Sequence, residues 1–411
     1  MLQKVKNISN RNAILIVLFF SIFSVFEEND TVCRFCVFFI LVLCLILGKR
    51  EEKLINPFFL FAFTPFSLLI YMNLGGRYML PLSVETWVLA IINMLAFILA
   101  LYYTPKFKLI SNCRGIKNTR ALIFSSLIFY VLSMTGRFVP QLQSLTWFLS
   151  IAAFVFAIKT KKKMMYMFCG FIFLSVSLSG HASKMGMLLL CVSFLICYDK
   201  FFVTSVAQIK KLFFLVVLGA FFMVFAFSFA NKERGHYDVN EGVAYYEKQG
   251  NISWNYGPTL FIPYMYITTP WTNVEYVCKS QNVRTNGLWM LKPLLGYIGL
   301  KENFEREYYL EPYSSFNTFT FIICGFKDFG YWGSIIMSFF LGWYVKKIYS
   351  RYVVSNSPFD VTCYILVGLA TVEMFFSNHF FMQSYPFTIL IVMEFWKFVL
   401  KLMGQTRLEI E

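Results

Sequence analysis

The chain has 411 residues, of which 58% are hydrophobic and 14% charged, and its formal net charge is +15. A soluble globular domain carries about 25% charged residues, so this composition excludes an ordinary soluble protein. The apolar residues come in blocks of roughly 16–22, the length of a helix that crosses about 30 Å of hydrocarbon. The sequence therefore predicts an all-α polytopic integral membrane protein. We expect membrane lipids and no nucleic acid as partners, because basic residues in such a protein serve first as topology signals.

The apolar blocks predict twelve membrane spans. Lys4, Lys6 and Arg11 precede the first block, and Glu27 and Glu28 follow it without a small-residue cleavage site. We therefore interpret this block as a membrane anchor and not as a cleaved signal peptide. In chain order the predicted spans are 12–27, 32–48, 55–72, 85–103, 121–136, 144–159, 164–179, 183–199, 212–230, 329–346, 359–376 and 383–401.

Basic residues gather in every second connection between these spans. The short connections of the other set hold one basic residue each, namely Arg34, Arg77, Arg137 and Lys184, and the last of them holds none. The positive-inside rule then places the basic connections and both chain termini in the cytoplasm. The basic set comprises Lys4/Lys6/Arg11, Lys49/Arg50/Lys53, Lys106 to Arg120, Lys159 to Lys163, Lys200/Lys210/Lys211, Lys346/Lys347/Arg351 and Lys397/Lys401/Arg407.

One connection is much longer than the others. Residues 231–328, between spans nine and ten, form a large outward-facing loop of mixed charge. Its apolar stretch 256–277 contains Pro258, Pro263 and Pro270, which are expected to break a helix, so we predict short interfacial helices there. A further membrane span is the alternative. The predicted organisation is a membrane domain 1–230 with helices 1–9, the loop 231–328, and a membrane domain 329–411 with helices 10–12.

The cysteines and the usual catalytic motifs give no sign of a cofactor. Cys33 and Cys36 form a CxxC, but they lie in an apolar block and are interpreted as small buried hydrophobic residues. No cluster of Cys and His has the spacing of a zinc site, so no metal and no other cofactor is expected. The sequence DFG at 328–330 lacks the glycine-rich loop and the HRD segment of a protein kinase.

Several isolated cations and all three histidines fall on the predicted outer side. The cations are Arg77, Arg137, Lys184 and Arg234, and the histidines are His181, His236 and His379. Cations that converge at a membrane surface suit a phosphate or diphosphate, which arginine binds through its bidentate fork. The alternative for each cation is that its side chain reaches lipid phosphate by snorkelling. A turn or capping role is the alternative for His181.

A charged pair, Lys327 and Asp328, lies inside the otherwise apolar run 314–333. We expect the chain to turn between Gly325 and Gly330, so that span ten begins near Asp328 and the pair lies at the outer interface. Asp328 then has two roles open to it, in chemistry or as the N-cap of span ten. Gly330 and Gly333 are expected to let the new helix pack closely on a neighbour.

The sequence FNTFTFIICGFKDFGYWGSIIMSFFLGWYVKKIY at 316–349 resembles the Wzy-type O-antigen polymerases, which join oligosaccharide repeat units. The resemblance rests on the span layout, on the large outer loop in the second half, and on a few short motifs. SLSGHASKMGMLLL (177–190) and YITTPWTNVEY (266–276) resemble two further recurrent stretches, although Lys184 stands where arginine is commoner. The other matching positions are Asn317-Thr318, Asp328-Phe329-Gly330, Gly333 and Leu341-Gly342.

The resemblance implies a GT-C-like glycosyltransferase in the bacterial inner membrane. Such an enzyme transfers a growing glycan from undecaprenyl diphosphate to the terminal sugar of a new lipid-linked repeat unit, and a Wzz-type chain-length co-polymerase is its expected partner. Arg137, Lys184 and Arg234, together with Arg77, would hold the diphosphate. Asp328, His236 or His379 would act as the base or orient the acceptor, and Asn317 would position sugar hydroxyls.

Three other functions stay open at this point. An O-antigen ligase shares the layout and carries a His and an Arg in its outer loop, and His236 keeps this function open. A GT-C enzyme that uses a polyprenyl-phosphate monosaccharide is suggested by EEND at 27–30, although that connection is short. A non-catalytic lipid-glycan flippase would need charges inside several spans, where this chain has mainly Glu373 and Glu394.

Overall fold

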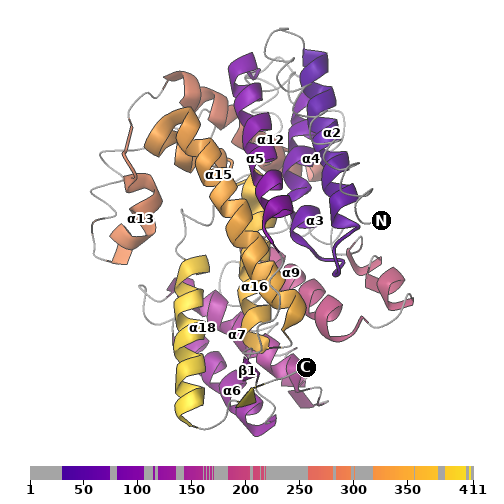
Figure 1. Ribbon diagram of the computed structural model, residues 1–411, viewed down its shortest axis with the longest axis vertical. Coiled ribbons are helices and arrows are strands. Elements are labelled where there is room, and N and C mark those ends of the chain that lie inside the picture. The colour runs from indigo at the N-terminus through magenta and orange to yellow at the C-terminus, as the bar shows by residue number, and fades with distance from the viewer. Residues whose placement is uncertain are drawn as a thin grey trace.

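The structure is a computed structural model in which the described residues are almost entirely helical (Figure 1). A two-residue antiparallel pairing, β1 (Arg114–Gly115) with β2 (Arg407–Leu408), is the exception among them. The described residues are 30–74, 81–105, 114–115, 119–135, 143–160, 162, 164–165, 167–168, 170, 184–203, 207–212, 214–216, 218, 258–280, 284–297, 300, 318–355, 357–377, 385–403 and 407–408. The helices are α2 (Asp30–Gly48), α3 (Pro57–Phe61), α4 (Phe63–Leu74), α5 (Val84–Tyr103), α6 (Thr119–Thr135), α7 (Gln143–Lys159), α9 (Lys184–Phe201), α12 (Pro258–Ser280), α13 (Leu288–Tyr297), α15 (Ile322–Val354), α16 (Pro358–Val372) with the 3-10 turn η3 (Glu373–Phe375), and α18 (Tyr385–Leu402).

Three of these helical segments are long and apolar enough to cross a membrane: Thr31–Gly48, Val84–Tyr103 and Pro358–Phe375. They coincide with predicted spans 32–48, 85–103 and 359–376, so the prediction of a helical membrane protein is confirmed at this level. The helices α3 with α4, α6, α7, α9 and α18 also fall where spans were predicted. The first predicted span and most of the spans at 164–179 and 212–230 lie outside the described residues.

Helix α16 occupies the centre of the bundle, and the long helix α15 crosses it (Figure 1). All residues of α16 are buried, and it packs against α3, α7, α9, α15 and α18. At one end of the bundle, called the Asp328 end below, α5 and α15 begin and α12 ends. At the other end, called the Tyr352 end, α2 and α15 end and α16 begins. These two ends present different chemistry.

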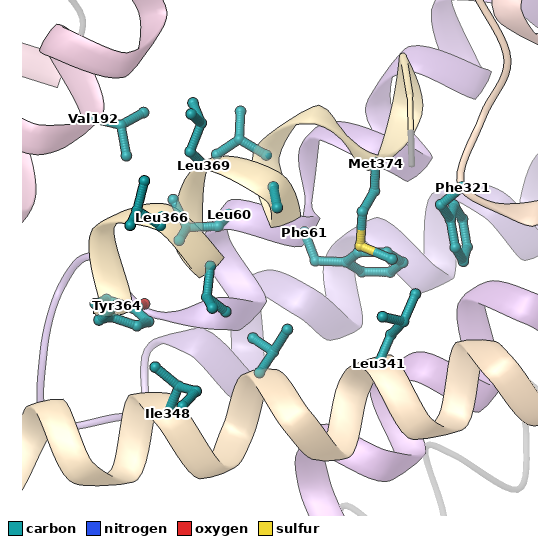
Figure 2. Packing of buried hydrophobic residues seen from close by; sticks show 14 of the residues in the cluster. Leu60, Phe61, Val192, Phe321, Leu341, Ile348, Tyr364, Leu366, Leu369 and Met374 are labelled. Carbon is teal, nitrogen blue, oxygen red and sulfur yellow. The ribbon is translucent and has the colours of Figure 1, made fainter. Parts of the chain in front are cut away.

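Aromatic and aliphatic side chains from four helical segments meet between α15 and α16. The Phe61 ring stacks on Phe97 with 4.2 Å between ring centroids, and Phe321 meets Phe61 edge-on at 6.0 Å. Figure 2 shows Met374 beside the Phe61 ring, with Phe321 and Leu341 next to it. Offset and edge-on pairs of this kind add roughly 0.5–1.5 kcal/mol each beyond the burial of their area. The N–H of Phe321 also donates to the carbonyl oxygen of Met374 at 2.9 Å.

Small residues bring α15 and α5 together side by side. A Cβ added to Gly342 would lie 2.4 Å from the carbonyl oxygen of Phe97, so only glycine permits this approach. Asn93 of α5 donates to Ser334 Oγ at 3.1 Å and accepts a hydrogen bond from Ser338 Oγ at 2.6 Å. Small residues and buried polar side chains are the features that join helices in a membrane, where lipid is as apolar as leucine.

Helix α15 is kinked at Gly330, which has φ 71° and ψ −154°. Glycine adopts this conformation without the steric cost that a side chain brings. The turn predicted between Gly325 and Gly330 is therefore confirmed, and the helix before the kink folds against the helix after it. Gly333 packs closely on a neighbouring helical segment as predicted, since a Cβ there would lie 2.9 Å from the carbonyl oxygen of Gly325 in the helix before the kink. Gly342 makes the close contact with α5.

The prediction that three prolines break the stretch 256–277 into short helices is wrong. Helix α12 begins at Pro258 and continues through Pro263 and Pro270 to Ser280. Next to Pro270, the hydroxyl of Thr268 donates to the carbonyl oxygen of Tyr264 and that of Thr269 to the carbonyl oxygen of Met265, so both threonine side chains are hydrogen-bonded within the helix. Full burial of Trp271 to Glu275 against the bundle then holds the helix together across the missing N–H groups.

The Tyr352 end is fixed by buried polar contacts. Tyr352 stacks on Tyr364 with 4.3 Å between ring centroids, and the Tyr364 hydroxyl donates to the carbonyl oxygen of Ile55 at 2.9 Å. Lys200 Nζ donates to the last carbonyls of α15, those of Tyr352 at 2.8 Å and Val353 at 3.0 Å. These contacts hold the connection between α2 and α3 to the ends of α9 and α15.

We predict that Gly342→Ala destabilises the bundle, whereas the matched change Gly170→Ala does not. The methyl group added at position 342 collides with the backbone of α5, and overpacking of this kind costs about 1–3 kcal/mol. A Cβ at Gly170 meets nothing within 4 Å. Both changes add the same atom to a helix, so their difference in apparent melting temperature in detergent reports the contact. Equal melting temperatures would contradict the close approach of α5 and α15.

Candidate functional site

The carboxylate of Asp328 lies at the centre of the contacts at its end of the bundle. Its side chain is fully buried. Oδ1 accepts hydrogen bonds from the Thr285 hydroxyl and from the backbone N–H of Trp289 at 2.9 Å, and Oδ2 accepts one from the N–H of Met290 at 2.9 Å. Asp328 therefore uses both oxygens to hold the start of α13.

The turn before α13 is suited to present these donors. Asn286 and Gly287 have φ values of 49° and 93°, the left-handed region that Asn-Gly turns favour. The N–H of Leu288 then donates to the carbonyl oxygen of Thr285 at 3.0 Å, and α13 begins. A carboxylate is stabilised at a helix N-terminus by the free N–H groups and by the helix dipole. The prediction that Asp328 caps span ten is wrong, because its carboxylate accepts from the first N–H groups of α13.

Arg284 and Lys327 lie side by side next to this cap. The N–H of Thr285 donates to the carbonyl oxygen of Lys327 at 3.1 Å, and Arg284 Nη1 donates to that of Phe326 at 2.6 Å. The guanidinium also lies 4.5 Å from the centre of the Phe326 ring. Lys327 precedes the kink and is 5% exposed, and its burial and then the charge of Arg284 lower the pKa of its ammonium group. Two positive charges are thus held together.

Glu275 forms a second polar junction at this end. It is fully buried, and its Oε2 accepts hydrogen bonds from the backbone N–H of Ser83 at 2.9 Å and from the Ser83 hydroxyl at 3.0 Å. Its Oε1 lies 2.5 Å from Nζ of Lys279, whose side chain is 59% exposed. Two residues earlier, Asn273 donates to the carbonyl oxygen of Thr318 at 2.8 Å. The end of α12 is therefore fixed to the start of α5 and to the segment that leads into α15.

Of the predicted site residues, Asp328 is the one whose side chain the structure describes. Lys184 is the first residue of α9, but its side chain is outside the described part of the chain. Whether the predicted cations converge stays a prediction. The remaining predicted residues lie outside the described ranges: Arg77, Arg137, Arg234, His236, Asn317 and His379.

Sequence reasoning missed Arg284, Thr285 and Glu275. A signal for the first two was present, because Asn286-Gly287 is a strong turn sequence and the polar residues before such a turn meet whatever the turn packs against. Glu275 lies within the stretch 266–276 that carries part of the family resemblance, but nothing in the sequence indicates that its partner is Ser83. Contacts over such separations depend on the tertiary fold.

The arrangement limits what Asp328 does chemically. A general base has to contact the hydroxyl that it deprotonates, at about 2.6–3.2 Å between heavy atoms. Three donors already surround this carboxylate, and no face of it is exposed. The described geometry therefore favours Asp328 as a positioning residue for α13, while its predicted role as a base stays untested.

We predict that Asp328→Ala loosens α13 and that Thr285→Val does so to a smaller extent. Loss of an N-cap costs about 0.5–2 kcal/mol, and Thr285→Val removes one of the three donors to Asp328 without changing the size of the side chain. Hydrogen exchange measured by mass spectrometry should rise in 288–297 and stay unchanged in 89–103. Unchanged protection of 288–297 in Asp328→Ala would contradict the capping role.

Comparisons of the chain with protein-family models, with curated proteins and with solved structures found no match. The resemblance noted in the sequence therefore remains a prediction. Together with the geometry of the Asp328 end, it forms the basis on which a function is proposed.

Proposed function

We propose that the protein polymerises undecaprenyl-diphosphate-linked oligosaccharide repeat units on the outer face of the bacterial inner membrane, and so makes O-antigen or a related surface polysaccharide. In this proposal the chain has twelve spans and a GT-C-like arrangement. Both termini lie in the cytoplasm, 231–328 is the large periplasmic loop, and a Wzz-type co-polymerase sets the chain length.

The observation that carries the proposal is that this loop is attached to the bundle by buried hydrogen bonds at the Asp328 end. Asp328 fixes α13, and Glu275 fixes the end of α12, so two helices of the loop are held in set positions beside the start of α15. A polymerase has to hold two lipid-linked glycans in register at the membrane surface, which needs a rigid platform. The paired charges of Arg284 and Lys327 on that platform suit a diphosphate.

The chemistry at the outer face requires such a site. No nucleotide sugar is available there, so the donor glycan must arrive on a lipid, and its leaving group is a diphosphate. Cations in a site of low dielectric constant stabilise the charge that develops on this leaving group. In the proposal, Arg137, Lys184 and Arg234, with Arg77, supply that charge. His236, His379 or Asp328 assists the attacking hydroxyl, and Asn317 orients the sugar.

The glycan pattern of a deletion strain tests the proposed function. Loss of a polymerase leaves one repeat unit attached to its acceptor, whereas loss of a ligase leaves long polymer unattached, and the two patterns differ on a gel. We expect single repeat units, restored to long chains by the wild-type gene. Arg137→Ala, Lys184→Ala, Arg234→Ala and Asp328→Ala are each expected to shorten the chains at normal protein levels. Long chains in all four variants would contradict the site.

The proposed orientation makes a separate prediction for two exposed lysines. Lys279 at the end of α12 should face the periplasm, and Lys401 at the end of α18 should face the cytoplasm. A membrane-impermeant maleimide should therefore label Lys279→Cys in intact spheroplasts, and Lys401→Cys only after the membrane is opened. The wild-type chain serves as the background for its native cysteines. Labelling of Lys401→Cys in intact spheroplasts would contradict the topology.

A further inference from the structure

Helix α15 has two faces of opposite character beyond its kink. The face toward α5 carries Ser334, Ser338 and Gly342, all buried. The opposite face carries large apolar side chains that are exposed, with Trp332 at 77%, Phe340 at 60% and Ile336 at 55%. The spacing of Trp332, Ile336, Phe339, Phe340 and Trp343 places these side chains on one face of the helix.

The composition of the exposed face disfavours another protein helix as its partner. Helices that pack in membranes use small residues at their contact, and α15 already uses its small residues against α5. A row of Trp, Phe and Ile instead suits a long, flexible hydrocarbon chain. The face is one helix wide, which matches a lipid with a single chain.

A cation lies at the beginning of this face. The guanidinium of Arg284 lies over the kink, because a Cβ built on Gly330 would be 3.5 Å from its Cζ and Nη2 atoms. The Phe326 ring beneath the guanidinium meets Tyr331 edge-on, with 5.2 Å between ring centroids. Tyr331, which is 43% exposed, therefore places an aromatic ring near Arg284 at the start of the helix that carries the exposed face.

Arg284 keeps hydrogen-bonding capacity for an anion. Nη1 is bound to the carbonyl oxygen of Phe326, and among the residues that the structure describes no carboxylate pairs with the guanidinium. The adjacent carboxylate of Asp328 is committed to α13. Lys327, which is 5% exposed, lies next to Arg284 and adds to the positive potential at this position, which favours a diphosphate over a singly charged phosphodiester.

We propose that this surface binds one polyprenyl diphosphate, with the diphosphate at Arg284 and the isoprenoid chain along the exposed aromatic face of α15. The identity of the lipid rests on the proposed function, which needs a polyprenyl diphosphate at this end of the bundle. The site adds Arg284 and the α15 face to the cations predicted from the sequence. In this site the isoprenoid chain of the polyprenyl diphosphate lies beside the bundle, while the diphosphate is held at the Asp328 end.

Binding of undecaprenyl diphosphate to the full-length protein in phosphatidylcholine nanodiscs tests the head-group contact. Loss of a charge-assisted contact costs about 1.5–3 kcal/mol, so Arg284→Gln should weaken binding by at least about tenfold. Arg284→Lys, which keeps the charge, should weaken it less. The matched control is Lys347→Gln, since Lys347 lies 3.8 Å from the centre of the Trp343 ring at the far end of the same face. Equal affinities of Arg284→Gln and Lys347→Gln, at equal melting temperatures, would overturn the proposal.

A second variant tests the site for the chain. Trp332→Ala removes an exposed side chain without opening the core, and should weaken binding of undecaprenyl diphosphate but not of dimethylallyl diphosphate, whose chain is too short to reach along α15. An equal loss of affinity for both diphosphates would overturn the assignment of the isoprenoid chain to this face. Competition by phosphatidylglycerol as strong as that by undecaprenyl diphosphate would also overturn it, because the surface would then be a general site for anionic phospholipids.

These binding results are separable from the proposed function. A deletion strain that still makes long chains would contradict the polymerase, yet a tenfold loss in Arg284→Gln would still support a polyprenyl-diphosphate site. Single repeat units in the deletion strain, combined with unchanged lipid binding by Arg284→Gln, would support the polymerase and overturn this site.

Discussion

The hydrogen bonds between the Asp328 carboxylate and the first turn of α13 fix the positions of the neighbouring residues at this end of the bundle. Asp328 follows Lys327 directly, so the same contact sets the backbone pairing between Lys327 and Thr285. That pairing in turn holds Arg284 over Phe326 and the kink at Gly330. A buried carboxylate is costly unless its oxygens are hydrogen-bonded, and here three donors satisfy it. The charged pair inside an apolar run is explained by this junction.

The kink at Gly330 connects this junction to the part of α15 that carries the exposed aromatic side chains. Before the kink, the helix carries the polar contacts of the platform, and after it the helix separates small residues on one face from large aromatic residues on the other. The small face gives close packing on α5, which makes α15 a rigid support. The aromatic face is exposed. In the proposed function, the polar contacts before the kink and the aromatic face after it bind the two parts of an amphiphilic substrate, and Arg284 lies between them at the kink.

Apolar length predicted the bundle well because a span is set by local composition. The span predicted at 85–103 matches α5 at Val84–Tyr103, and the turn before span ten was found from its glycines. The predictions failed where a residue acts over a long distance. Pro263 and Pro270 do not break α12, because burial of the helix against the bundle stabilises it across the missing N–H groups. Asp328 caps α13 and not its own helix, and no local sequence pattern around Asp328 indicates α13 as its partner.

The central claim is that the protein itself joins lipid-linked repeat units. Purified protein in proteoliposomes, supplied with undecaprenyl-diphosphate-linked repeat units extracted from the deletion strain, gives the most direct measurement. We expect new lipid-linked glycans that are longer by whole repeat units, formed without lipid A-core and without any nucleotide sugar. Glycans that stay at one repeat unit, while the same protein restores long chains in the deletion strain, would contradict it.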